Sequence, residues 1–130
     1  MPVTYTHEKN SKFVFTRVDD VLTTGEIISH FSRMIDDAAL PPEFVEVVDF
    51  GGCRDVEFRY SDFAKLQTLS LVLRDRGLQI SLFRAFSQES RNIIEFLIPL
   101  FTSISITTHI CSSESELADA MDAFLNASVE

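Results

Sequence analysis

A chain of 130 residues in which 45% of the side chains are apolar can bury one sizeable core, so we expect residues 1–130 to form a single domain. Its net charge of −9 repels nucleic-acid phosphates and anionic membranes, which disfavours both as partners. The sequence has no apolar run of the roughly 18 residues that a membrane span needs, and no basic segment followed by an apolar one at its start. We therefore expect a cytoplasmic protein.

The cysteines and histidines give no metal-binding or redox pattern. Cys53 and Cys111 lie far apart and outside any C-x-x-C motif, so we expect free, buried thiols. His7, His30 and His109 fall on different predicted elements, without the close spacing of a metal site. The sequence therefore predicts neither a metal nor another cofactor.

The first part of the chain predicts a hairpin followed by a helix. Val3–His7 and Lys12–Val18 are strand-like and flank a short polar turn. Thr23 is followed three residues later by Glu26, which is a capping-box pattern. Apolar residues at helical spacing then predict a helix that ends near Ala39.

The middle of the chain predicts a buried strand and a second helix. Phe44–Phe50 is rich in β-branched residues, as a central strand is. The pair Gly51-Gly52 is expected to break that strand. Ser61 is a good N-cap for the following helix, and Gly77 marks the end of that helix.

The last part alternates strand and helix once more. Leu78–Ala85 and Ile104–Cys111 are predicted strands, and Ser87 can cap the helix between them. Ser113 begins a second capping box, which opens a C-terminal amphipathic helix. The element order ββαβαβαβα predicts an α/β fold, with a mixed, mostly parallel sheet of about five strands flanked by helices.

This order resembles the STAS domains of anti-sigma-factor antagonists, and more closely their SpoIIAA-like bacterial relatives. Three segments carry the resemblance: the hydrophobic strand Val45–Phe50 with Asp49 near its end, the apolar helix Gln88–Phe101, and the acidic helix start Ser113–Glu116. The resemblance implies a STAS-like fold and a non-enzymatic, regulatory role through protein–protein contact.

Ser61 is a candidate phosphorylation site by the same resemblance. In regulatory STAS domains the helix after the loop starts at a phosphorylatable Ser or Thr, within an Asp-Ser-Ser-Gly-like signature. The matching segment here is Arg59-Tyr60-Ser61-Asp62, which lacks the preceding Asp, the second Ser and the Gly. A phosphate would be favoured at a helix N-terminus, whereas the alternative is a plain N-cap.

A second candidate site lies at the predicted carboxyl edge of the sheet. Asp49, Gly51, Gly52 and Arg84 follow or end neighbouring strands, where ligands of open α/β sheets bind. The glycine amides and Arg84 could hold an anion. The alternative is a pair of turn glycines, a structural Asp49 and an Arg84 that is exposed or paired with Asp49.

No catalytic constellation is visible in the sequence. There is no G-x-S-x-G elbow, and neither cysteine lies in a nucleophile context. Glu43 and Glu46 alternate with apolar residues, which we interpret as solvated positions, and His30 is expected to be exposed. An enzyme working near Asp49 and Arg84 is kept as a third hypothesis.

The third helix is apolar on more than one face and contains Pro99, which would kink it. Such a helix is either buried, or an interface between two copies, or the wall of an apolar pocket opened by the kink. The interface hypothesis places the contact on Ile94, Leu97, Ile98 and Phe101. The pocket hypothesis, for a lipid or another apolar small molecule, places it on Phe96, Leu100 and Phe101.

The first functional hypothesis is a non-enzymatic, cytoplasmic interaction module that forms a homodimer and contacts an unidentified protein partner. The contact surfaces are the third helix and the region around Ser61. The alternative is a small apolar-ligand or lipid carrier. An interaction module should show an exposed apolar patch, a carrier an enclosed apolar cavity, and an enzyme a cleft with converging polar groups.

Overall fold

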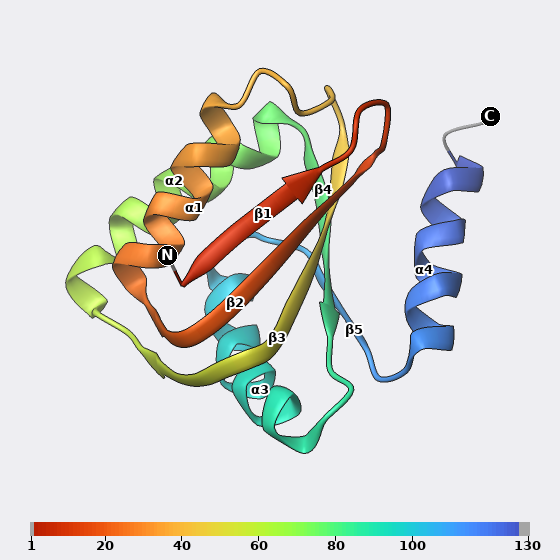
Figure 1. Ribbon diagram of the computed structural model, residues 1–130. Coiled ribbons are helices and arrows are strands. Elements are labelled where there is room, and N and C mark those ends of the chain that lie inside the picture. The colour runs from red at the N-terminus through yellow and green to blue at the C-terminus, as the bar shows by residue number, and fades with distance from the viewer. Residues whose placement is uncertain (1, 128–130) are drawn as a thin grey trace.

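The computed structural model describes residues 2–127 as a five-stranded sheet with helices on both faces (Figure 1). The strands lie side by side in chain order. They are β1 (Val3–His7), β2 (Phe13–Thr23), β3 (Phe44–Glu57), β4 (Leu78–Arg84) and β5 (Thr108–Cys111). β1 pairs antiparallel with β2, whereas all later pairs are parallel, which confirms the predicted mixed, mostly parallel sheet.

Three of the four helices cover one face of this sheet. The helices are α1 (Thr24–Asp36), α2 (Phe63–Arg76), α3 (Gln88–Ser103) and α4 (Glu114–Ala127), and a short 3-10 turn, η1 (Tyr60–Asp62), precedes α2. Each crossover advances the sheet by one strand in the same direction. Because such crossovers are right-handed, α1, α2 and α3 fall on the same side. No strand follows α4 within the described chain, and this helix packs on the opposite face (Figure 1).

Alternation along the strands divides the core between the two faces. Val14 and Val18 face the large cluster formed with α1, α2 and α3. Phe13 points the other way, into a smaller cluster that contains Leu117 of α4. That second face is only partly covered, because Phe15 of β2 remains exposed.

The polar caps predicted from the sequence start three of the helices. The hydroxyl of Thr23 accepts a hydrogen bond from the amide of Glu26, and Ser87 accepts one from Ser90. At α4, Ser113 accepts from the amide of Glu116. These bonds satisfy amide groups that a helix N-terminus leaves free, which is why the three starts were visible in the sequence.

The prediction that Gly51-Gly52 breaks the central strand is wrong. β3 continues through both glycines to Glu57, paired with a β2 that is correspondingly longer than expected. Two register shifts in β2 accommodate the pairing. The Asp19 side chain of β2 occupies the space beside Gly52, where an added Cβ would lie 1.9 Å from Oδ1 of Asp19. The segment after Gly52, up to Glu57, is therefore part of the strand.

The last strand is shorter than predicted and begins at Thr108. Ile104 and Ile106 are nevertheless buried, in the connection from α3. Ser105 turns the chain there with a φ of +64°. The amide of Ile106 then donates to the carbonyl of Phe101 at 2.9 Å, which closes the end of α3. The alternating isoleucines therefore reflect a buried helix end and not a strand.

Candidate functional site

At the predicted anion edge, Arg84 is paired with carboxylates of the protein itself. Arg84, at the end of β4, donates to Oδ2 of Asp49 at 3.1 Å and to Oε1 of Glu114 at 3.0 Å. Its guanidinium also stacks over the ring of Phe86. The amide of Gly51 donates to Oδ1 of Asp49 at 2.8 Å. Arg84 is thus paired with Asp49, as one of the alternatives from the sequence expected, whereas Gly51 and Gly52 lie within β3 and not in a turn.

A groove lies where η1 and the start of α2 meet the second half of α3. Its volume is about 580 Å³. Two large exposed aromatic side chains line it, Tyr60 with 85% of its surface exposed and Phe96 with 60%. We call it the α2/α3 groove, lined by Phe58, Tyr60, Phe63, Glu95, Phe96, Pro99, Leu100 and Ser103.

The two contact regions expected from the sequence, α3 and the segment around Ser61, therefore meet at one surface. The α3 residues that line this surface are not the ones expected at the interface. Ile94, Leu97 and Phe101 face the core and are buried, so these candidate interface residues cannot meet a partner. Ile98 is partly buried against the same core. The expected apolar pocket is likewise divided, because Phe96 and Leu100 line the groove while Phe101 does not.

Ser61 lies exposed in η1 and not at the N-cap of α2. The N-cap residue is Asp62, whose side chain makes no capping hydrogen bond. Both neighbours of Ser61 line hollows of this region, Tyr60 the α2/α3 groove and Asp62 an adjoining one of about 320 Å³. The N-cap prediction for Ser61 is thus wrong by one residue, and its hydroxyl is open to solvent.

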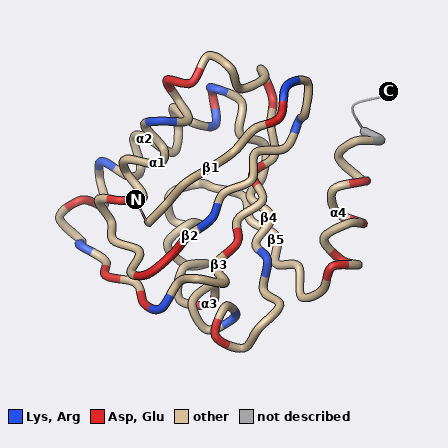
Figure 2. The backbone as a smooth tube through the Cα atoms, in the orientation of Figure 1, with Lys and Arg blue, Asp and Glu red and all other residues tan. Residues whose placement is uncertain are grey.

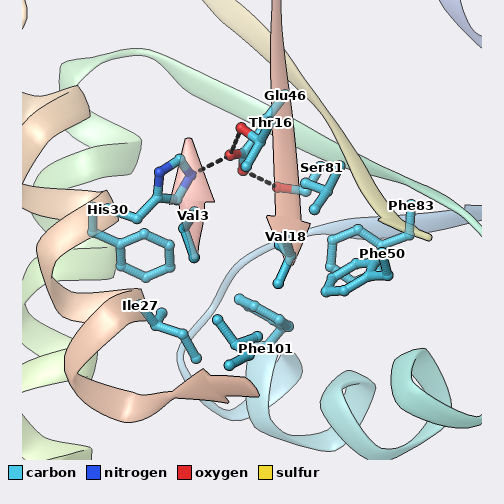
Figure 3. Close-up of a pocket in the computed structure, with 13 residues that line it drawn as sticks. Val3, Thr16, Val18, Ile27, His30, Glu46, Phe50, Ser81, Phe83 and Phe101 are labelled. Carbon is cyan, nitrogen blue, oxygen red and sulfur yellow. Dashed lines mark hydrogen bonds and ion pairs between the residues drawn. The ribbon is translucent and has the colours of Figure 1, made fainter. Parts of the chain in front are cut away.

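A polar cluster that the sequence analysis missed lies inside the core. Glu46, in the middle of β3, is only 3% exposed, and His30 of α1 is 5% exposed. Oε2 of Glu46 lies 2.5 Å from Nε2 of His30 and accepts a hydrogen bond from the hydroxyl of Thr16 at 2.6 Å. The hydroxyl of Ser81 donates to Oε1 at 3.3 Å. Figure 3 shows these three partners converging on the carboxylate.

The electrostatics of this cluster favour an ionised Glu46. Burial by itself raises the pKa of Glu46, but attraction to His30 and the hydrogen bonds from His30, Thr16 and Ser81 outweigh that effect. The pKa of Glu46 consequently lies below its ordinary value. Nδ1 of His30 is buried and has no hydrogen-bond partner among the described residues.

The burial of Glu46 and of His30 corrects two expectations, and the sequence contained a pattern that indicates each of them. Glu46 was expected to be solvated, yet a central parallel strand is buried on both faces, so a charged residue within it must also be buried. His30 was expected to be exposed. It lies three residues after Ile27 and four before Met34, on the stripe of α1 that faces the core.

The cluster borders a small cavity of about 30 Å³. Apolar side chains from α1, α3 and the sheet form the rest of its wall, among them Ile27, Phe83 and Phe101 (Figure 3). That volume suits one or two water molecules, whereas ligand pockets measure roughly 300–1,000 Å³. The cavity is therefore too small for the lipid of the carrier hypothesis.

The remaining candidate residues fall into ordinary surroundings. Cys53 and Cys111 are free and buried, and burial raises the pKa of both thiols. Nε2 of His7 contacts the carbonyl of Ser11, and His109 is exposed on β5. Within residues 2–127, no three His, Cys, Asp or Glu side chains are grouped as a metal site requires. None of the helices described there is long and apolar enough to cross a membrane.

Neither protein-family models nor curated protein sequences match this chain. Among solved structures, it is similar to the anti-sigma factor antagonist SpoIIAA in its unphosphorylated form. The TM-score is 0.48 and the sequence identity 14%, over 92% of this chain and 97% of that one. At this TM-score and identity, the likeness carries no fold, site or activity over to this chain.

Proposed function

We propose that this protein is a non-enzymatic, cytoplasmic regulatory module that binds another protein through the α2/α3 groove. The observation that carries the proposal is the exposure of Tyr60 and Phe96 on the two sides of one groove. Large aromatic side chains contribute most of the binding free energy at protein interfaces, and a contiguous exposed apolar patch is uncommon on a monomer without a partner.

Affinity purification from the source cells tests this proposal. The bait proteins are the wild type, Phe96→Ser and a matched control, Leu71→Ser, which changes an exposed apolar residue of α2 outside the groove. A partner captured by the wild type and Leu71→Ser, but lost with Phe96→Ser, is the expected result. Recovery of the same proteins with all three baits would contradict it.

In this proposal, phosphorylation of Ser61 regulates binding at the α2/α3 groove. Its exposed hydroxyl lies between Tyr60 and Asp62, so a phosphate there would add negative charge beside the groove. We expect Ser61→Asp to change the amount of captured partner, whereas Ser61→Ala should behave as the unmodified wild type. Equal capture by both variants would remove Ser61 from the proposal.

A homodimer is the other association expected from the sequence. Native mass spectrometry of the gently purified protein measures it directly. A bare dimer would add self-association to the proposed role. A monomer that carries a reproducible extra mass of lipid size would contradict the interaction module and favour a carrier.

A further inference from the structure

The α2/α3 groove combines an apolar lining with negative charge. Phe58, Phe63 and Leu100 supply partly buried apolar surface beside the exposed rings. Phe58 and Tyr60 are held edge to face, with their ring centroids 5.1 Å apart. Rings fixed in this way form a ready-made seat for one or two apolar side chains, because little side-chain entropy is lost when they are covered.

The charges around this seat are mainly acidic. Glu95 lines the groove itself. The adjoining hollow shares Phe58 with the groove and is lined by Glu57, Asp62 and Arg59. Asp62 is the N-cap residue of α2, so part of its charge offsets the positive end of that helix. Glu57 and Glu95 remain as exposed carboxylates against the single guanidinium of Arg59.

The backbone of α3 leaves one carbonyl near the groove without its usual helical donor. Pro99 lies inside the helix and has no amide hydrogen, so the carbonyl of Glu95 lacks its usual helical donor. Both residues line the groove. The last turn of α3 contains no basic side chain to offset the negative end of the helix, and Ser103 of that turn also lines the groove.

We infer that the occupant of the α2/α3 groove is a linear segment of a partner protein in which an apolar side chain stands next to Lys or Arg. The apolar side chain covers the aromatic seat, and the cation lies against the carboxylates of Glu57 and Glu95. A second copy of this chain fits less well, because it would bring two acidic rims into one interface. This inference rests on the proposed function and specifies its partner.

A random 12-residue peptide library displayed on phage identifies the preferred segment. The library is selected on the full wild-type protein after depletion on Phe96→Ser, so that binders outside the groove are removed. We expect the retained peptides to be enriched in Lys or Arg beside aliphatic or aromatic residues. The most enriched peptide is then synthesised and used as the probe.

Charge variants separate the acidic rim from the apolar seat. Glu57→Gln combined with Glu95→Gln should weaken binding of the basic peptide about three- to tenfold at low salt, and less at high salt. The control removes two charges from α4, on the other face of the sheet, by Asp119→Asn with Asp122→Asn, and should leave the affinity within about twofold. Circular dichroism checks that every variant is folded.

Each other outcome overturns the inference in a distinguishable way. Neutral or acidic peptides that bind the groove and are lost in Phe96→Ser would disprove the basic segment while the proposed function stands. A wild-type dimer that Phe96→Ser dissociates would make a second copy the occupant. An absence of groove-dependent peptides would disprove recognition of a linear segment, and the affinity purification above then decides the proposed function alone.

Discussion

Glu46 and His30 form a buried pair in the core, with Oε2 of the carboxylate 2.5 Å from Nε2 of the imidazole. The two residues come from the central strand β3 and from α1, so the pair joins the sheet to its helical layer. Replacing only one partner leaves the other polar group buried without compensation, which is more costly than replacing both.

Removal of the imidazole should therefore destabilise the protein strongly. His30→Leu leaves the Glu46 carboxylate uncompensated in the core, and we expect a loss of about 3–5 kcal/mol in the free energy of unfolding. His30→Leu combined with Glu46→Leu should lose less than His30→Leu alone. Urea unfolding followed by circular dichroism measures all three proteins. A single variant as stable as the wild type would show that the pair contributes nothing.

The same pair should make stability depend on acid pH. The pKa of Glu46 is below its ordinary value of 4.5, so the folded state binds this proton less readily than the unfolded state does. The stabilising contribution is complete above pH 4.5 and is lost as the pH falls through the lowered folded-state pKa. Urea midpoints between pH 7 and pH 3 should fall less steeply for Glu46→Gln than for the wild type. Parallel curves would assign the acid sensitivity to other carboxylates.

Tyr5 should ionise only in strongly alkaline solution. Burial and the hydrogen bond from its hydroxyl to Oδ2 of Asp37, at 2.8 Å, raise the pKa of Tyr5 to about 12. Its contribution to stability is therefore complete below pH 10 and is lost as the pH rises through about 12. Ultraviolet titration of the tyrosinate should show a late step that Tyr5→Phe abolishes and Tyr60→Phe leaves. Loss of that step in Tyr60→Phe would reverse the assignment.

Two neighbours in α3 should respond in opposite ways to truncation. Leu97 is fully buried, so Leu97→Ala should cost about 2–5 kcal/mol of stability. Phe96 is largely exposed, and Phe96→Ser should change stability by less than about 1 kcal/mol. Urea unfolding of the two variants tests which face of α3 is free. A large loss in Phe96→Ser would mean that the ring is covered in solution.

Alanine substitutions at Gly77 and Gly52 should lower stability by different amounts, because different atoms stand where the added Cβ would lie. An added Cβ at Gly77 would lie 1.9 Å from the backbone carbonyl oxygen of Pro42, and φ is +140°. At Gly52 the obstacle is the side chain of Asp19, which can rotate away. We expect Gly77→Ala to lower the thermal midpoint more than Gly52→Ala does. The reverse order would indicate that the approach of Asp19 is the tighter constraint.

Local patterns sufficed for the element order and for the starts of α1, α3 and α4. Thr23, Ser87 and Ser113 cap their helices through bonds that span three residues, so a short window of sequence contains the whole interaction. The continuation of β3 through Gly52 could not be found in this way. It depends on pairing with the second half of β2, which lies far away in the sequence.

For the candidate sites too, local sequence predicted some features, whereas others depend on the whole fold. The segment around Ser61 and helix α3 were each singled out from the sequence, but only the fold brings Tyr60 and Phe96 to one groove. The pair of Glu46 and His30 was missed because each residue was judged against its immediate neighbours. The burial of Glu46 follows from the coverage of β3, which is a property of the whole sheet, whereas the burial of His30 follows from its place on the core-facing stripe of α1.

The acidic residues are not spread evenly over the elements. Figure 2 shows Asp and Glu on α4 and no Lys or Arg there, and the sequence of this helix contains four acidic residues. Its inner side packs on the smaller core cluster through Leu117. Its acidic outer surface is consequently poorly suited to bind an anionic partner.

The order of strands has a consequence for how the chain can be built during synthesis. Because neighbours in the sheet are also neighbours in the chain, every strand from β2 onward meets a partner that has already left the ribosome. Pairing never has to wait for a segment that is still untranslated, and a finished strand is never displaced by a later insertion. The sheet can thus grow at one edge only, from β1 toward β5.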